Sequence, residues 1–134
     1  MRPRNKSSKL ELEELEKLLL KFKNYKVGIE FHGGEPLLMG KRKFEEYLSL
    51  IATYKNIVKI FLQTNGVLLD DEYLNLIEYY CPDKMNIGIS LDGLEENNRN
   101  RYNFSGKNSF NQVCSSLKKL NRRKIRFGVL WLQN

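Results

Sequence analysis

Segments rich in apolar and β-branched residues alternate with amphipathic helical segments along most of this 134-residue chain. Four of these segments are predicted to be strands. They are Lys26–Phe31, Ile57–Thr64, Met85–Leu91 and Arg126–Leu132. Such alternation favours parallel strands joined by right-handed crossovers, with helices covering the outside. The predicted fold class is therefore α/β with a parallel sheet.

Four longer segments carry apolar residues at helical spacing. They are Lys9–Lys23, Arg42–Tyr54, a segment from Asp70 or Asp71 to Tyr80, and a helix capped by Ser109 that ends near Asn121. In the first helix, Ser7 or Ser8 is expected as the N-cap, with Glu11 completing a capping box. Its apolar stripe consists of Leu12, Leu15, Leu18, Leu19 and Phe22. Residues 1–8 are expected to be a disordered lead, and Leu94–Arg101 a short helix.

Composition limits the class of protein. The chain is long enough for one domain with a core, and 41% hydrophobic and 29% charged residues are ordinary for a soluble protein. No apolar run is long enough to span a bilayer, and the basic start lacks the apolar segment of a signal peptide. We expect a cytoplasmic protein with no membrane partner. The two cysteines, Cys81 and Cys114, form no disulfide framework, and a buried structural role is favoured for each over a ligand role.

The net charge of +7 invites a nucleic-acid interpretation. The basic residues are spread along predicted helix faces and helix ends, where a solvated cation needs no partner. No nucleic-acid-binding motif accompanies them. We therefore expect no nucleic-acid partner.

The sequence Phe31-His32-Gly33-Gly34-Glu35-Pro36 directly follows the first predicted strand. Glycine reaches positive φ cheaply and lets another group approach the backbone, and Pro36 stiffens the exit from the loop. The motif thus predicts a stiff loop that presents bare backbone groups and one carboxylate, at the sheet edge where α/β proteins bind ligands. A plain strand-to-loop turn with an exposed glutamate explains the motif equally well.

Two further strands end in polar turns that contain glycine. The turns are Gln63-Thr64-Asn65-Gly66 and Ser90-Leu91-Asp92-Gly93. In a parallel sheet all three strand ends lie on one rim, which gathers Glu35, Asn65, Ser90 and Asp92, with Arg101 a few residues beyond. Carboxylates and carbonyls suit an ammonium group and a guanidinium suits a carboxylate, so this rim fits an amino-acid-like ligand.

These motifs, in this order and spacing, resemble those of the radical SAM enzymes. The quoted matches are Phe31–Leu38, Gln63–Leu68, Ile89–Gly93 and Asn100-Arg101. The most similar branch contains the anaerobic sulfatase-maturating enzymes and the peptide maturases with a SPASM-type extension. The resemblance covers Lys9–Asn134 and implies an incomplete core domain: a partial parallel (βα) barrel of about four strands, the second to fifth of that family's (βα)6 barrel.

The resemblance also implies a cofactor, S-adenosylmethionine, and a set of residues that bind it. Gly33, Gly34 and Glu35 would hold the methionine ammonium, with Gly34 nearest. Ser90 would contact the ribose or methionine end, Arg101 would pair with the carboxylate, and Asn65 would support the rim. For His32 we expect a rim or packing role rather than a ligand role.

The sequence departs from the family at the iron–sulfur cluster. The family holds a [4Fe-4S] cluster with cysteines spaced C-x3-C-x2-C, and the resemblance places that segment before Lys9, where no such triplet occurs. Neither Cys81 nor Cys114 can replace it, so no metal ligand is assigned. Two exposed sheet edges are expected, at Lys26–Phe31 and Arg126–Leu132, and with them a marginal, aggregation-prone monomer or one that docks with another chain.

Three hypotheses follow. The first is a fragment of a radical SAM maturase that acts on a peptide or protein through a 5′-deoxyadenosyl radical, inactive alone, with a second chain that supplies the cluster segment as a candidate partner. The second is a non-catalytic remnant that binds a peptide or partner chain by strand addition. The third is a basic nucleic-acid-binding protein whose affinity falls steeply with salt.

Overall fold

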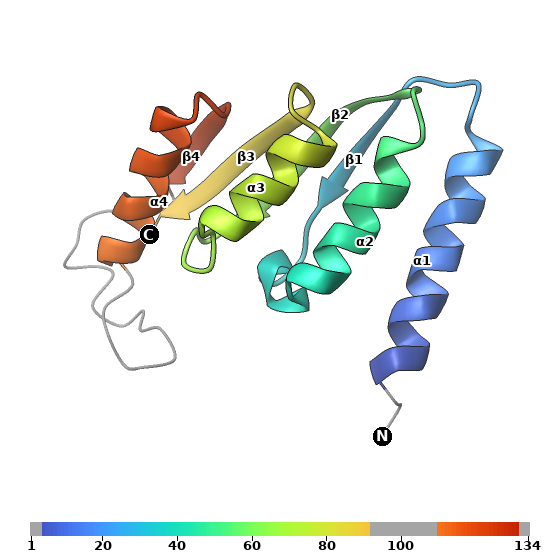
Figure 1. The fold of residues 1–134 in the computed structure, drawn as a ribbon, viewed down its shortest axis with the longest axis horizontal. Helices are drawn as coiled ribbons and strands as arrows, with labels where there is room; N and C mark the ends of the chain where they lie inside the picture. The colour runs from blue at the N-terminus through green and yellow to red at the C-terminus, as the bar shows by residue number, and fades with distance from the viewer. Residues whose placement is uncertain (1–3, 92–109, 132–134) are drawn as a thin grey trace.

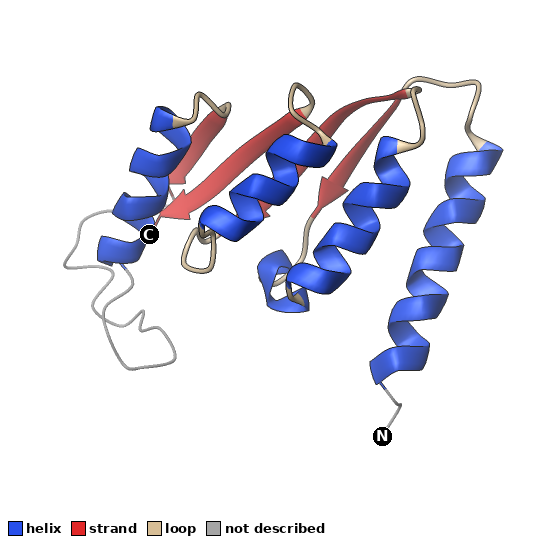
Figure 2. Ribbon diagram, in the orientation of Figure 1, coloured by secondary structure: helices blue, strands red, loops and turns tan. Residues whose placement is uncertain are grey.

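A single layer of helices covers one face of a four-stranded parallel sheet (Figures 1 and 2). The structure, a computed structural model, describes residues 4–91 and 110–131. Its elements are α1 (Arg4–Lys21), β1 (Val27–Phe31), the 3₁₀ helix η1 (Pro36–Met39), α2 (Lys41–Ala52), β2 (Ile57–Thr64), α3 (Asp71–Tyr80), β3 (Met85–Leu91), α4 (Phe110–Arg122) and β4 (Phe127–Trp131). The strand order is β1-β2-β3-β4, and every neighbouring pair is parallel. The predicted α/β class and the open, partial (βα) barrel are confirmed.

The core lies between the sheet and the helices. Alternate residues of β2 and β3 point toward the helices and are buried, because side chains alternate between the two faces of a strand. The fully buried residues are Leu37, Phe44, Leu48, Ile57, Ile60, Leu62, Leu74, Ile77, Ile87, Ile89 and Leu120. The opposite face, the concave or inner face of a barrel of this kind, carries residues such as Phe61 and Leu130 that stay exposed.

Tertiary contacts also set the ends of the helices. Asp70 caps α3, because its carboxylate accepts the backbone N–H of Tyr73 at 3.0 Å. The Tyr73 hydroxyl in turn donates to the Leu37 carbonyl at 2.7 Å and anchors η1. Lys41 pairs with Asp70 at 2.7 Å, which joins the start of α2 to the start of α3. Among the described residues no helix is long and apolar enough to cross a membrane.

The first helix differs from its prediction at its start. α1 begins at Arg4 rather than at Lys9, so residues 4–8 are helical here and Ser7 and Ser8 lie inside the helix rather than at its N-cap. The physical reason is that a serine cap is a weak signal when helix-compatible residues precede it. The short helix expected over Leu94–Arg101 lies outside the described residues.

The apolar stripe of α1 is only partly buried. Leu19 is buried and Leu12 and Leu15 are half-buried, whereas Leu18 is 55% and Phe22 42% exposed. The reason is visible in Figure 1, where α1 stands beyond β1, the last strand of the sheet, with no further strand beneath it. Both sheet edges, β1 and β4, are therefore where the sequence predicted them.

Candidate functional site

The loop after β1 is exposed at its histidine and glycine residues. His32 is exposed, and Gly33 and Gly34 have φ angles of 89° and 55°, in the left-handed region that favours glycine. Among the described residues, no heavy atom lies within 4 Å of the position that a Cβ would take at either glycine. The backbone of this pair is thus accessible to a bound group at the carboxyl end of the sheet.

Glu35 holds this loop in place rather than pointing freely into solvent. It is half-buried and caps η1, because its Oε1 accepts the backbone N–H of Leu37 at 3.2 Å. The same oxygen accepts the Thr64 hydroxyl at 2.5 Å, and Oε2 accepts the backbone N–H of Asn65 at 2.8 Å. A carboxylate has about four acceptor positions, so three are occupied by protein donors. Most of the acceptor capacity of Glu35 is thus used to join the ends of β1 and β2.

The turn after β2 is stiffened from two sides. Asn65 Oδ1 accepts the backbone N–H of Val67 at 3.0 Å, which closes an Asx turn. Gly66 has a φ of 77° and packs so closely that a Cβ there would lie 3.4 Å from Ile89. The buried hydroxyl of Ser116 on α4 lies 2.7 Å from the Gly66 carbonyl and donates to it. Asn65 is therefore held at the rim beside Glu35.

Ser90 lies on the inner face of β3 and is tied to β2. The Gln63 carboxamide donates from Nε2 to Ser90 Oγ at 2.9 Å. Gln63 can reach Ser90 because Gly88 lies between them; a Cβ at position 88 would collide with the Gln63 carboxamide. In this bond Ser90 acts as an acceptor, so the bond to Gln63 does not use the Ser90 hydroxyl proton.

The structure brings some of the predicted site residues together, and others lie outside the residues that it describes. Glu35 contacts Asn65 directly, and Ser90 lies at the same carboxyl end of the sheet. Asp92 and Arg101 lie outside the described residues. The contributions of Gln63, Thr64 and Gly88 were not predicted. No sequence signal identified them, because it is the register of β2 and β3 in the fold that sets Gln63 beside Gly88.

The cysteines do not form a metal site. Cys81 is buried at the end of α3, and burial raises the pKa of its thiol to about 11. This confirms the structural role predicted for it; Cys114 is half-buried in α4. Within residues 4–91 and 110–131 there is no group of three or more histidine, cysteine, aspartate or glutamate side chains able to hold a metal ion. The donor set of these described residues does not fit a [4Fe-4S] cluster.

Comparison with known proteins matches this geometry to one family. The sequence profile of the Radical SAM superfamily matches residues 1–132. The cysteine-type anaerobic sulfatase-maturating enzyme of Clostridium perfringens (strain ATCC 13124) is 34% identical over 124 residues, which are 89% of this chain and 32% of that enzyme. The enzyme of the same description from Clostridium novyi (strain NT) is 32% identical over 108 residues, 78% of this chain and 28% of that enzyme.

Solved structures agree with the sequence relatives. Native anSMEcpe with bound AdoMet has a TM-score of 0.74 and 31% identity, covering 90% of this chain and 33% of that chain. The same enzyme with bound AdoMet and the Cp18Cys peptide has a TM-score of 0.73. The chain spans about a third of the length of these relatives. On its sequence profile, relatives and fold, this chain belongs to the radical SAM superfamily.

Proposed function

We propose that this chain binds S-adenosylmethionine at the carboxyl rim of its sheet. The observation that supports this most directly is the Glu35-centred set of hydrogen bonds, which holds the open Gly33-Gly34 pair beside Asn65. Structural neighbours that are 31% identical have been solved with AdoMet bound. The rim residues present therefore fit the cofactor.

Each rim residue has a proposed task. The Gly33 and Gly34 carbonyls accept the methionine ammonium, and Glu35 contributes its remaining acceptor position and the rigidity of the loop. Ser90 donates its hydroxyl proton to an oxygen of the ribose or the carboxylate. Arg101 pairs with the carboxylate, and Asn65 keeps the two loops in register. His32 lines the rim.

We propose the catalytic activity of the whole protein from its relatives. The relatives are named anaerobic sulfatase-maturating enzymes, and one neighbour holds a bound peptide. We propose that residues 9–134 are an incomplete radical SAM core domain of a cytoplasmic oxidoreductase that modifies a peptide or protein, with no nucleic-acid or membrane partner. Such enzymes in the SPASM branch need a [4Fe-4S] cluster, and this chain has two cysteines, so activity requires a second chain or segment that supplies the ligands.

A second candidate function is a non-catalytic module that binds a peptide or partner chain. The observation in its favour is that no described strand pairs with the outer edge of β1 or β4, and that β4 exposes Val129, Leu130 and Trp131. Free edges accept an added strand through main-chain hydrogen bonds. This function needs no cofactor.

Calorimetry with S-adenosylmethionine distinguishes the two. The wild-type chain is titrated beside Ser90→Ala, which removes the proposed donor, and Ser49→Ala, which changes an exposed serine on α2. We expect saturable binding that weakens by about tenfold in Ser90→Ala only. Absence of binding by the folded wild-type chain would overturn the cofactor proposal and leave the binding module.

A further inference from the structure

We propose that Gln63 is a positioning residue of the cofactor site, whose carboxamide turns the hydroxyl proton of Ser90 toward the bound ligand. The inference rests on the proposed binding of S-adenosylmethionine and deepens it, because it names the group that orients the Ser90 donor. Gln63 and Ser90 belong to β2 and β3, the two central strands, each of which is paired on both sides.

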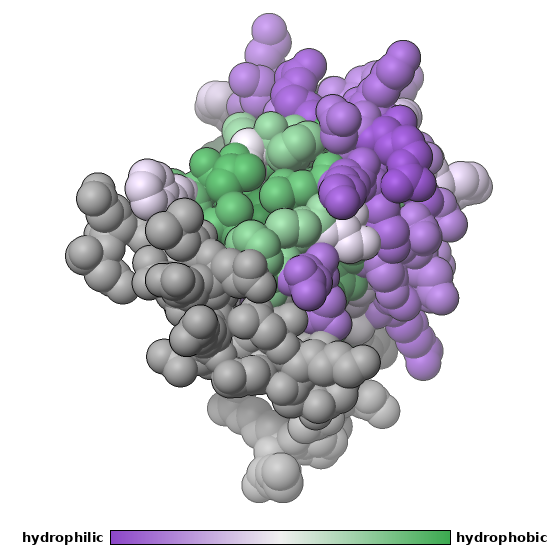
Figure 3. Space-filling model, turned by 90° about the vertical axis from the view of Figure 1, so that its left-hand side faces the viewer, coloured by the Kyte–Doolittle hydropathy of each residue, from purple (hydrophilic) through white to green (hydrophobic). Residues whose placement is uncertain are grey.

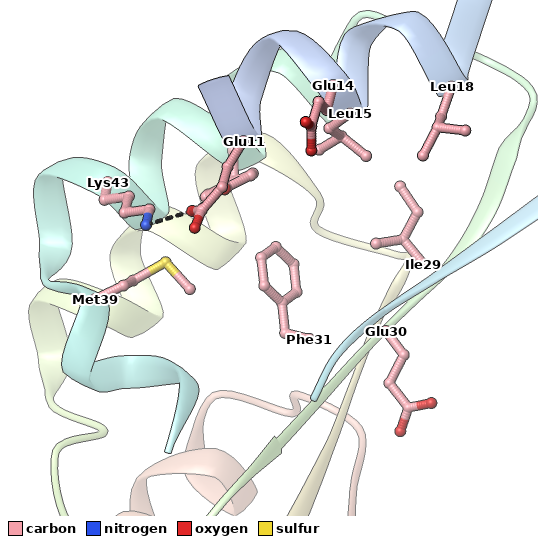
Figure 4. Close-up of a pocket in the computed structure, with 10 residues that line it drawn as sticks. Glu11, Glu14, Leu15, Leu18, Ile29, Glu30, Phe31, Met39 and Lys43 are labelled. Carbon is pink, nitrogen blue, oxygen red and sulfur yellow. Dashed lines mark hydrogen bonds and ion pairs between the residues drawn. The ribbon is translucent and has the colours of Figure 1, made fainter. Parts of the chain in front are cut away.

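Gln63 lies on the inner face of the sheet, away from the helices. Figure 4 shows how the side chains alternate on the neighbouring strand β1, where Ile29 and Phe31 point toward α1 and Glu30 points away from it. Glu30 pairs with Phe61 of β2, so Phe61 lies on the same inner face. Gln63 follows Phe61 by two residues, which sets it on this face and nearer the carboxyl rim.

The bond between Gln63 and Ser90 has a defined direction. Gln63 Nε2 donates to Ser90 Oγ at 2.9 Å. An amide NH₂ group only donates, so Ser90 is the acceptor, and the single proton of its hydroxyl then points away from Gln63. Within residues 4–91 and 110–131, this is the one bond that the structure gives to Ser90 Oγ. The orientation of the Gln63 amide therefore decides where the Ser90 proton points.

Gly88 gives the amide the room that this orientation needs. It pairs with Gln63 in register, and a Cβ at position 88 would overlap Oε1 of Gln63. The carboxamide thus lies over the Gly88 backbone and reaches Ser90, the next residue of β3 on this face. Gly128 of β4 pairs with Gly88, so no Cβ stands on the far side of the amide either. Any larger residue at position 88 should push the amide away from Ser90.

The surroundings of Ser90 favour a hydroxyl that is oriented in advance. The register partner of Ser90 in β4 is the apolar Leu130. Figure 3 shows that the surface at the β4 end of the molecule is largely apolar, with hydrophilic residues to one side of it. A hydrogen bond is stronger where the local dielectric is low. A proton that already points toward the ligand does not have to be ordered on binding, so the orientation should add to the affinity.

Two variants separate positioning from mere support of the serine. Gln63→Met has a similar length and makes no hydrogen bond, so Ser90 keeps its proton but loses its orientation. In Gln63→Glu the ionised carboxylate only accepts, so Ser90 donates to it and its proton is withdrawn from the ligand. Support alone predicts tighter cofactor binding by Gln63→Glu, which keeps a bond to Ser90, than by Gln63→Met. Positioning predicts the opposite order.

Calorimetric titration with S-adenosylmethionine measures this order. We expect the dissociation constant to rise about two- to threefold in Gln63→Met and about tenfold in Gln63→Glu. Asn86→Asp is the matched control, because it makes the same amide-to-carboxylate change on the inner face of β3, nearer the amino end of the strand. It should leave the dissociation constant within about twofold of the wild-type value. Circular dichroism checks that each variant is folded.

A double-mutant cycle tests whether Gln63 acts through Ser90. In the Ser90→Ala background there is no proton to turn, so adding Gln63→Glu should change the dissociation constant by less than about twofold. Direct repulsion between the new carboxylate and the ligand would persist in this background and would overturn the proposal. Gly88→Ala displaces the amide without altering it and should weaken binding as Gln63→Met does. It takes the place of Gln63→Glu if that variant does not fold.

The outcomes separate this inference from the proposed function. Absence of binding by the folded wild-type chain would defeat cofactor binding itself, and the positioning role with it. Wild-type binding that weakens in Ser90→Ala but is unchanged in Gln63→Glu would overturn the positioning role alone. A dissociation constant that is higher in Gln63→Met than in Gln63→Glu would also overturn it, because Gln63 would then only support the serine.

Discussion

The carboxylate of Glu35 accepts the backbone N–H of Asn65 at 2.8 Å, and this bond joins the loop after β1 to the turn after β2. The same carboxylate accepts donors from Thr64 and Leu37. One side chain therefore fixes the relative position of two rim segments that are thirty residues apart in sequence. Its first task is structural, and any contact with a ligand is added to it.

Replacing Glu35 should accordingly destabilise the fold. In Glu35→Gln an amide NH₂ group takes the place of an acceptor oxygen and faces a backbone donor. We expect the free energy of unfolding in urea to fall by about 1–3 kcal/mol. Glu30→Gln, at an exposed position on β1, is the control and should change it by less than about 0.5 kcal/mol. Equal effects of the two variants would contradict this structural role.

Ser116 should be a second anchor of the rim. Its buried hydroxyl lies 2.7 Å from the Gly66 carbonyl and 3.1 Å from that of Leu69. Ser116→Ala leaves these buried acceptors without that donor and should cost about 1–3 kcal/mol of unfolding free energy. The neighbouring Ser115 is exposed on the same helix, so Ser115→Ala measures only the effect of the change in helix propensity. A variant at 116 as stable as that at 115 would refute the anchor.

Gly88 should act through Gln63. A Cβ at position 88 displaces the Gln63 carboxamide, so Gly88→Ala and Gln63→Met each remove the same bond to Ser90. Each single variant should lower the free energy of unfolding by about 0.5–1.5 kcal/mol. The double variant should lower it by no more than one single variant does. Gly128 pairs with Gly88 in register, and no heavy atom of the described residues lies within 4 Å of its Cβ position, so Gly128→Ala is the matched control. Additive costs would show that the two residues act separately.

Stability at high pH should depend on Cys81. Burial raises the pKa of its thiol from 9.0 to about 11 in the folded chain. The unfolded chain therefore loses this proton first, and the free energy of unfolding falls as pH rises from about 9 to about 11, by at most about 2–3 kcal/mol. In Cys81→Ala this part of the slope should vanish, whatever the variant's stability at pH 7. Parallel curves for the two proteins would rule the effect out.

The two central strands and α3 were predictable because local signals and burial agree there. Ile57–Thr64 and Met85–Leu91 are rich in β-branched and apolar residues, and their alternate residues lie in the core. Asp70 is a typical N-cap residue, and the segment that follows it has apolar residues at helical spacing. The start of α1 and the partial exposure of its stripe were not predictable in this way. The apolar stripe of a helix is buried only where another element packs against it. Here α1 lies beyond β1, the edge strand of the sheet.

The candidate site was predictable in outline but not in its bonding. Glycine turns after parallel strands identify the rim, and they correctly bring Glu35 and Asn65 together. The tasks of Thr64, Ser116 and Gln63 depend on partners that are distant in sequence or on the opposite strand. No local pattern reports such partners, because a polar residue inside a strand or helix reads as solvent-exposed until the fold is known.

The loose attachment of α1 has a consequence for the dynamics of the chain. Asn56 donates to the carbonyls of Phe22 and Tyr25 at 3.1 and 2.9 Å, so the end of the helix is pinned while its middle is held mainly by Leu19 and by the bonds of Glu11 to Lys43 and Tyr47. Opening α1 exposes little buried surface, so its amide hydrogens should exchange through a local fluctuation far below the global free energy of unfolding. Such an opening would uncover the helix-facing residues Ile29 and Phe31 of β1 to solvent while the sheet itself stays folded.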